Sequence, residues 1–203
     1  MRRTKEDTEI SRQQILDAAE NIFCRKGFTG TKLNDIADAI GMTKGAIFWH
    51  FESKAGLFRA IHIRAVARLR EILTTTMALP DPIMERFKKT VFAVRHDSAF
   101  DVLLSIGLGD ITDVPSNLQE EVNESIDQLL GMVRSNIEEA LSNGLICTNA
   151  SAGEILSPLL LVMSGFRNLN IIKQISGQLA SIIDGDTAIE AIFKGLNSYQ
   201  TKK

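Results

Sequence analysis

The sequence predicts an all-α protein of about nine helices, with a three-helix N-terminal domain and a larger helical domain behind it. Leu, Ile, Ala, Glu and Lys are frequent, apolar residues recur at helical spacing, and glycines or prolines separate the apolar stretches. Ala and straight-chain residues lose little side-chain freedom in a helix, whereas Gly and Pro tend to end one. With 203 residues, 44% of them hydrophobic and 24% charged, the chain is long enough to bury a sizeable core.

The first expected helix covers about residues 8–26. Its apolar face consists of Ile15, Ala18, Ala19, Ile22 and Phe23. Gly27 can adopt the positive φ that often follows a helix, and Phe28 beyond it can pack back on Phe23. We therefore expect the chain to turn sharply after this helix.

Two short helices follow, and they form a predicted helix-turn-helix. Thr31 is expected to cap a helix that ends at Gly41, and Thr43 is expected to cap the next one, at residues 44–51. Gly, Ile, Phe, Trp and His dominate the second of these helices. Because they are mediocre helix formers, tertiary packing must stabilise it.

Six more helices are expected in the rest of the chain. Ser53 opens a long helix that ends before Pro80 and connects two predicted domains, residues 1–53 and 54–203. The others are expected at about residues 81–95, 98–108, 115–143 and 151–175, with a last helix that ends near Tyr199. Gly144 is the expected stop of the helix at 115–143.

The helix at 151–175 contains a proline whose role has two interpretations. Ser151 and Glu154 have the spacing of a capping box, which places Pro158 inside the helix, where it would free a carbonyl group and kink the chain. The alternative is a later helix start at Ser157.

Charge is distributed unevenly, although the net charge is only −2. Residues 1–70 contain 13 Lys and Arg against 8 Asp and Glu, whereas residues 71–203 contain 10 against 17. A basic first third suits a protein whose N-terminal part meets phosphates.

Several classes of protein are disfavoured. No apolar run approaches the roughly 20 residues that span a bilayer, and the N-terminus lacks the apolar stretch of a secretory signal, so we expect a cytoplasmic protein without a membrane partner. Cys24 and Cys147 are predicted to be buried thiols, with a redox-sensing Cys147 as the alternative. The three histidines lack metal-ligand spacing, and no phosphate loop or nucleophile elbow occurs. We expect no enzyme, catalytic residue, metal or cofactor.

Ala37, Gly41 and Ile47 form the pattern A-x3-G-x5-I. The small residue allows two helices to approach, the glycine supplies the turn, and the aliphatic residue anchors the following helix. Ile47 and Phe51, four residues apart, are expected to face this core together. The other faces of the helix at residues 44–51 are then expected to point outward, and DNA is the partner predicted to cover them.

The stretch GFTGTKLNDIADAIGMTKGAIFWHFESKAGLF resembles the TetR family of bacterial transcriptional regulators. The resemblance covers about residues 10–60, with Thr31, Ile36, Ala37, Gly41, the K-G-x-[IL]-[FY]-x-H-F run and Lys54 in register. It implies a homodimer that binds a double-stranded DNA operator through the N-terminal domain and a small-molecule effector through the other domain. The last two helices would form the dimer interface, and their excess of apolar residues agrees with this.

By position, the resemblance also implies which residues meet DNA. The recognition helix would present Lys44, Gly45, Ala46, Phe48, Trp49 and His50. Phosphate contacts would come from Thr31, Lys32 and Lys54, and Thr31 and Thr43 could place helix N-termini at phosphates. The family usually has Tyr where this chain has Phe48, so either one phosphate contact is absent or the ring packs against a sugar or a thymine methyl group.

The effector site is expected among the helices of the second domain. Polar residues within apolar helical stretches are the candidates, since a buried polar group needs a partner that a ligand can provide. They are His62, His96, Ser105, Asp110, Asn168 and Asn170. For each of them, an ordinary core or surface position is the alternative.

These residues predict a sequence-specific transcriptional regulator, a repressor that leaves a palindromic operator when a small-molecule effector binds. An effector-independent DNA-binding or architectural protein of the same fold is the alternative. An α-helical enzyme with an incidental helix-turn-helix is a third hypothesis, which no motif supports.

Overall fold

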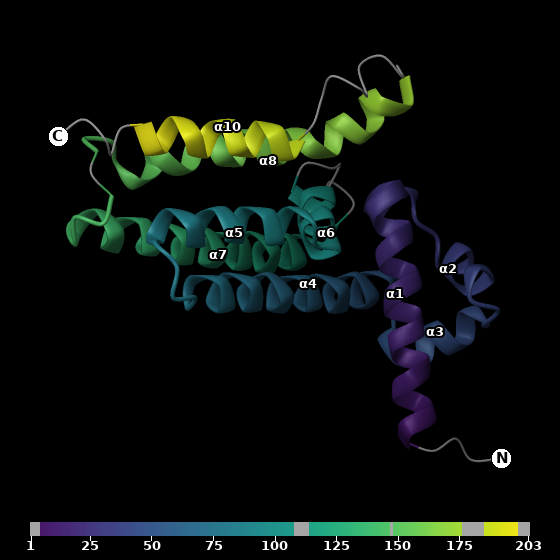
Figure 1. Cartoon of the computed structure of the whole chain (residues 1–203). Coiled ribbons are helices and arrows are strands. Elements are labelled where there is room, and N and C mark those ends of the chain that lie inside the picture. Colours follow the sequence, from purple (N-terminus) through teal and green to yellow (C-terminus); the bar gives the residue numbers. More distant parts are fainter. Residues whose placement is uncertain (1–4, 108–113, 147, 176–184, 199–203) are drawn as a thin grey trace. The chain divides into compact units, whose positions relative to one another are not determined.

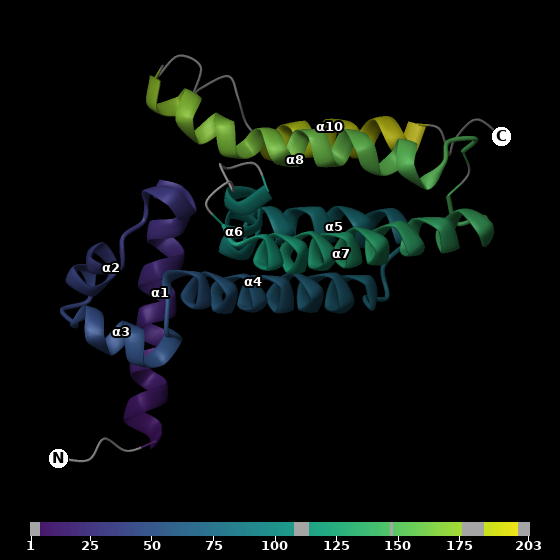
Figure 2. The same cartoon turned by 180° about the vertical axis from the view of Figure 1, so that it is seen from behind.

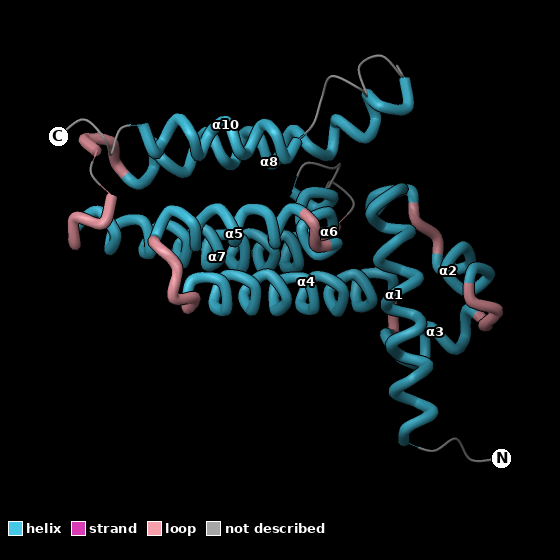
Figure 3. Tube along the Cα trace, in the orientation of Figure 1, coloured by secondary structure: helices cyan, strands magenta, loops and turns pink. Residues whose placement is uncertain are grey.

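The computed structural model describes residues 5–107, 114–146, 148–175 and 185–198. These residues form nine helices and no strand. Figure 3 shows how loops join the helices. The all-α prediction is therefore confirmed for the part of the chain that the structure describes. None of the helices in these ranges is long and apolar enough to cross a membrane.

The chain divides into two compact units that are not continuous in sequence. The first contains residues 1–68 and 98–126, and the second contains residues 69–97 and 127–203. The helices α4 (Lys54–Met77) and α7 (Ser116–Ser142) each contribute residues to both units. In the first unit, α6 (Ser98–Gly107) packs against α1 (Lys5–Gly30), while the division into functional domains after residue 53 stays a prediction.

In the first unit, α1 packs against α2 (Leu33–Ala39), and α2 packs against α3 (Lys44–Phe51), as seen in Figure 1. Its core contains three aromatic rings, of which Phe28 and Phe58 lie 4.9 Å apart and Phe23 and Phe58 lie 5.2 Å apart. The predicted contact between Phe23 and Phe28 is present, with the rings stacked at 6.1 Å. These rings join α1 and α4.

Glycines with a positive φ lie at three predicted helix stops, and two of them, Gly41 and Gly144, follow the ends of α2 and α7. Gly27, Gly41 and Gly144 have φ angles of 69°, 64° and 66°, a region that L-residues with a side chain rarely adopt. Gly27 does not separate α1 from the next turn completely, because the chain resumes a helical course to Gly30 beyond the kink.

The prediction that Thr31 caps the second helix is wrong. Lys32 occupies the cap position of α2, and no side chain caps this helix. Thr31 is only 1% exposed, and its hydroxyl group donates to the carbonyl oxygen of Gly27 at 2.7 Å. The hydroxyl therefore stabilises the end of α1 instead of the start of α2.

The second unit contains α5 (Ile83–Arg95), α8 (Ala152–Ile175) and α10 (Gly185–Ser198). Figures 1 and 2 show α10 alongside α8 from opposite sides, and α10 also packs against α5. Buried apolar residues fill the space between these helices: Met84, Phe87, Val91, Leu159, Met163, Ile189 and Phe193. The predicted bounds of α5 and α8, and the predicted end of α10, agree with the structure to within two residues.

Ser151 and Glu154 form the predicted capping box. The backbone N–H of Ser151 donates to Oε2 of Glu154 at 2.8 Å, and the N–H of Glu154 donates to Oγ of Ser151 at 3.3 Å. The bond from the Ser151 N–H lowers the pKa of the Glu154 carboxyl group, and so does the Ser151 hydroxyl group, which donates to the same Oε2 at 2.8 Å. Pro158 lies inside α8, so a helix start at Ser157 is excluded.

Two cysteine predictions have different outcomes. Cys24 is half-buried rather than buried. Cys147 lies outside the described residues.

Candidate nucleic-acid interface

Local interactions and burial together hold α3. The hydroxyl oxygen of Thr43 accepts a hydrogen bond from the N–H of Ala46 at 3.2 Å, which confirms the predicted cap. Ile47 and Phe51 are both buried on the inner face of the helix. Because the residues of α3 have modest helix propensity, this anchoring is what keeps eight residues helical.

The turn between α2 and α3 has the geometry that the A-x3-G-x5-I pattern predicts. Gly41 has a positive φ, and the N–H of Met42 donates to the carbonyl oxygen of Ala37 at 2.9 Å. Ala37 is buried beside Ile36. The small residue, the glycine and the aliphatic anchor thus lie at the positions where two helices can cross closely.

The outer side of α3 is aromatic and basic. Trp49 is 69% exposed and Phe48 is 55% exposed, while Lys44 and Gly45 are also at the surface. Ala46 and His50 are half-buried, and the rings of Trp49 and His50 meet edge to face at 4.7 Å. Two adjacent aromatic side chains at this level of exposure are unusual on a protein surface unless a partner covers them.

The phosphate contacts that the family resemblance implied lie in different settings. Lys32 and Thr43 are exposed. The Thr31 side chain is buried and bonded to Gly27. Lys54 is half-buried, and its ammonium group donates to the carbonyl oxygens of Phe28 at 2.8 Å and Thr31 at 3.1 Å. Thr31 and Lys54 therefore direct their donors into the protein.

An ion pair joins α1 to α2 beside this surface. Nζ of Lys26 lies 2.6 Å from Oδ2 of Asp35, and this hydrogen bond lowers the pKa of the Asp35 carboxyl group. On the other side, the guanidinium group of Arg12 lies 5.3 Å from the centroid of the Phe51 ring. Both contacts help to set α1 against the helix-turn-helix.

Of the expected effector residues, His62 is buried in the first unit. Its Nε2 lies 2.6 Å from Oγ of Ser125, while Nδ1 is buried without a partner among the described residues. Burial lowers the pKa of His62, although the carboxylate of Glu121 opposes this shift. Ser125 is a partner that sequence spacing did not indicate.

His96 is an exposed residue of the second unit. Its Nε2 lies 3.3 Å from Oδ1 of Asp186, and Arg95 also pairs with that carboxylate. Ser105, Asn168 and Asn170 lie in α6 and α8, but their side chains are outside the described set, as is Asp110 altogether. Among the candidates whose side chains are described, His62 belongs to the first unit and His96 to the second, and the effector site stays a prediction.

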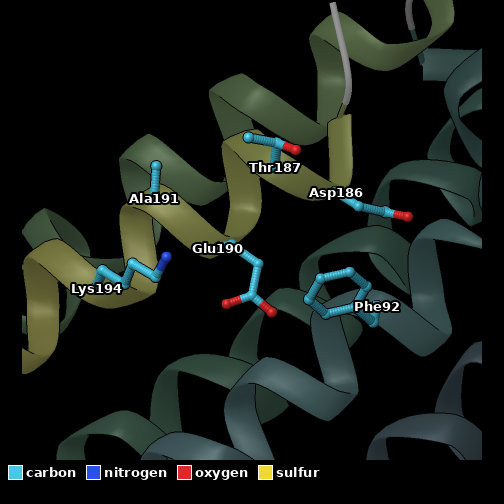
Figure 4. Close-up of a pocket in the computed structure, with 6 residues that line it drawn as sticks. All are labelled: Phe92, Asp186, Thr187, Glu190, Ala191 and Lys194. Atoms are coloured by element: carbon cyan, nitrogen blue, oxygen red, sulfur yellow. The ribbon is translucent and has the colours of Figure 1, made fainter.

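A hollow of about 380 Å³ lies between α5 and α10, and sequence analysis did not find it. Figure 4 shows Glu190 reaching from α10 toward the ring of Phe92 on α5. The lining residues are Phe92, Asp186, Thr187, Glu190, Ala191 and Lys194. Asp186, Glu190 and Lys194 recur every four residues on one side of α10, and this spacing is the signal that could have indicated a shared face.

Ion pairs across the hollow already neutralise part of its charge. Nζ of Lys88 lies 2.7 Å from Oε1 of Glu190, and this hydrogen bond raises the pKa of Lys88. Asp186 pairs with Arg95. The hollow therefore offers an aromatic ring and paired charges rather than an unbalanced acidic surface.

Comparison with known proteins places the N-terminal helices in a family. Residues 15–61 match the model of bacterial regulatory proteins of the tetR family. The HTH-type transcriptional regulator TtgR of Pseudomonas putida is 49% identical over 61 residues, which are 30% of this chain and 29% of TtgR. The HTH-type transcriptional repressor BepR of Brucella suis is 28% identical over 209 residues, covering 98% of this chain and 97% of BepR.

The helix-turn-helix segment of this chain, residues 15–61, thus matches the TetR family, and BepR is similar over nearly the whole chain. The first curated relatives are matched over less than a third of their length, since the aligned part is 28–29% of each. A crystal structure of AibR in complex with isovaleryl coenzyme A and operator DNA has the same fold, with a TM-score of 0.64 and 18% identity over 78% of this chain and 86% of that one. The matched proteins are named transcriptional regulators, which agrees with the prediction that this chain is not an enzyme.

Proposed function

We propose that this TetR-family chain is a homodimeric transcriptional repressor that binds a palindromic DNA operator through α3. The single observation that carries the proposal is the outer side of α3, where Phe48 and Trp49 are exposed on a helix that Thr43 caps and Ile47 anchors. A rigid helix with an exposed ridge can enter the major groove, which is wide enough to admit an α-helix. BepR, similar over nearly the whole chain, is named a transcriptional repressor.

Within this proposal, the residues of α3 have different roles. Lys44 and Lys32 provide exposed positive charge for phosphates or base edges. Gly45 is exposed near the start of the helix and allows a close approach to the duplex. The ring of Phe48 packs against sugars or thymine methyl groups, because it has no hydrogen-bonding group, whereas the indole N–H of Trp49 can also donate to a phosphate or a base edge.

Dimerisation would use α8 and α10, the helices that pack together in the second unit. Leu161 on α8 is 70% exposed, and Leu160 beside it is also partly exposed. A second copy of the chain would cover these side chains. A twofold dimer would then offer two α3 helices to half-sites about one DNA turn apart.

The first experiment asks whether the chain prefers a sequence. Purified protein would be used to select duplexes from a random library, and the selected duplex would be footprinted and its dissociation constant measured against unselected DNA. We expect a palindromic site with affinity at least about a thousandfold above unselected DNA. Equal binding to both would contradict the proposal.

Variants of α3 then test the residue roles. Gly45→Ala is the sharpest, because a Cβ at position 45 would meet only Oγ1 of Thr43, at an ordinary 3.7 Å. The helix should become slightly more stable, by roughly 0.5–1 kcal/mol, while affinity for the selected duplex falls. Unchanged affinity would show that the start of α3 does not approach DNA closely.

Trp49→Ala and Lys44→Glu should abolish binding while the circular dichroism spectrum remains helical, because both side chains are at the surface. Ile63→Ala is a matched control, since Ile63 is an exposed apolar residue of α4 in the same unit. If Trp49→Ala and Lys44→Glu both bound like the wild type, the assignment of α3 as the recognition helix would be wrong.

We also propose that a small-molecule effector releases this chain from its operator, a step that an effector-independent protein of the same fold would not need. The structure of AibR with isovaleryl coenzyme A and operator DNA supports a ligand-responsive chain, whereas an architectural protein would act without a ligand. A thermal-shift screen of small metabolites separates the two. A ligand at 100 times its dissociation constant should stabilise the protein by about 2.7 kcal/mol and lower DNA affinity. A screen without any such ligand would favour the effector-independent alternative.

A further inference from the structure

We propose that Lys54 is a positioning residue that holds the two ends of the helix-turn-helix together, and that it does not bind DNA phosphate. This inference rests on the proposed function, because it concerns how α3 is presented to DNA. It differs from the role that the family resemblance implied for this lysine. The hydrogen bonds of its ammonium group carry the inference.

The Lys54 ammonium group is occupied on several sides. It donates to the carbonyl oxygen of Phe28 at 2.8 Å and to that of Thr31 at 3.1 Å. Its nitrogen also lies 4.2 Å from the centroid of the Phe28 ring, within the range of a cation–π contact. An ammonium group has three N–H donors, so these contacts use most of its capacity.

Both accepting carbonyl groups lie beyond the break of the helical course at Gly27, at a helix end where carbonyl groups carry a partial negative charge. The carbonyl oxygen of Phe28 also accepts from the N–H of Thr31 at 3.2 Å, so the ammonium group uses its second lone pair. A lysine ammonium group supplies both a donor and a compensating charge. Moving it outward to a phosphate would remove a charge-assisted hydrogen bond from each carbonyl group.

The position of Lys54 in the chain explains what this contact achieves. Phe28 lies in the last turn of α1 and Thr31 in the loop before α2, while Lys54 begins α4 with only two residues between it and the end of α3. One side chain therefore links the segment before the helix-turn-helix to the segment after it. The Thr31 hydroxyl and the pair of Lys26 with Asp35 stabilise the same corner, so loss of Lys54 should loosen the setting of α3 without unfolding the unit.

The test compares Lys54→Met with Lys32→Met, which removes an exposed charge from the residue that precedes α2. Hydrogen exchange without DNA would be measured on peptides covering residues 28–40. We expect exchange there to be at least about tenfold faster in Lys54→Met and unchanged in Lys32→Met. Equal exchange in Lys54→Met and wild type would overturn the proposal, whether or not an operator has been found.

Salt dependence then separates positioning from phosphate binding. On the selected duplex, a lost phosphate contact should reduce the slope of log affinity against log salt by about 1. We expect this reduction in Lys32→Met, whereas Lys54→Met should bind at least tenfold more weakly with the wild-type slope. A slope reduced by about 1 in Lys54→Met, with normal exchange, would identify Lys54 as a phosphate ligand and overturn the proposal.

If Lys54→Met fails to fold, Lys54→Gln tests the same point. The amide group is neutral but still a hydrogen-bond donor, so it should restore part of the affinity and protection if Lys54 acts by positioning. If Lys54 acted on phosphate by its charge, Gln would behave like Met in affinity and slope. That second result would contradict the proposal.

Discussion

Gly56, in the first turn of α4, lies directly against the backbone carbonyl group of Phe51, the last residue of α3. A Cβ atom built at position 56 would overlap the carbonyl oxygen of Phe51. The N–H of Gly56 also donates to Oγ of Ser53 at 2.9 Å, which confirms Ser53 as the opening residue of α4. The turn from α3 into α4 is therefore so tight that position 56 has room only for glycine.

Gly56→Ala should destabilise the protein. The clash is with backbone, which cannot move aside as a flexible side chain can, so we expect a loss of about 1–3 kcal/mol in the free energy of unfolding. Urea denaturation followed by circular dichroism would measure it. Gly131→Ala is the control, because a Cβ there meets nothing within 4 Å and should be neutral or stabilising. Equal stability of Gly56→Ala and wild type would show that the turn is looser than described.

Glu52→Gly should stabilise the protein. Glu52 has φ 63° and ψ −33°, and it is the central residue of a three-residue turn in which the N–H of Ser53 donates to the carbonyl oxygen of Phe51 at 2.7 Å. Such a conformation is strained for a residue with a side chain. Glycine relieves this strain but also adds entropy to the unfolded chain, which offsets part of the gain. We expect a net increase of roughly 0.5–1 kcal/mol in the free energy of unfolding.

The same denaturation experiment would measure the effect of Glu52→Gly. Glu124→Gly is the matched control, because Glu124 is an exposed residue inside α7. There, glycine should cost about 1 kcal/mol. A loss of stability in both variants would mean that Glu52 is not strained.

His62 should make the protein less stable in acid. Burial lowers its pKa in the folded state below the ordinary 6.5, so the unfolded chain binds a proton at a pH where the folded chain does not. The free energy of unfolding should therefore fall as pH decreases below about 6.5, and the loss should end below the folded-state pKa. Denaturation midpoints between pH 5 and 8 would measure the trend.

His62→Gln should reduce this dependence on pH, while His96→Gln controls for removal of an exposed histidine. The His62→Gln variant also loses the contact of the imidazole ring with Oγ of Ser125, so its stability at pH 8 provides the reference for its own pH series. A pH dependence that is the same in His62→Gln and wild type would contradict the assignment.

Leu161→Glu should prevent dimerisation. A charge at this exposed position of α8 would have to be buried in the proposed interface, whereas it remains hydrated in a single chain. Light scattering should give the mass of one chain, with unchanged helical circular dichroism. Leu145→Glu, also an exposed leucine of the second unit, should remain dimeric. A dimeric Leu161→Glu would place the interface elsewhere.

The helices and most of their ends follow from the sequence because they depend on interactions within about four residues. The cap of α3 by Thr43, the capping box of Ser151 and Glu154, and the positive φ of Gly41 all belong to this class. So does the division of α3 into an inner side with Ile47 and an outer side with Trp49. Spacing along one helix determines each of them.

Contacts between distant segments were decided only by the tertiary structure. Lys54 reaches carbonyl groups 23 and 26 residues earlier, and His62 meets Ser125 across 63 residues. Thr31 has the residue type of a helix cap, yet the path of the chain after Gly27 turns its hydroxyl group inward. The physical reason is that helix propensity and spacing specify a helix and its faces, whereas the crossing of helices specifies which polar group meets which partner.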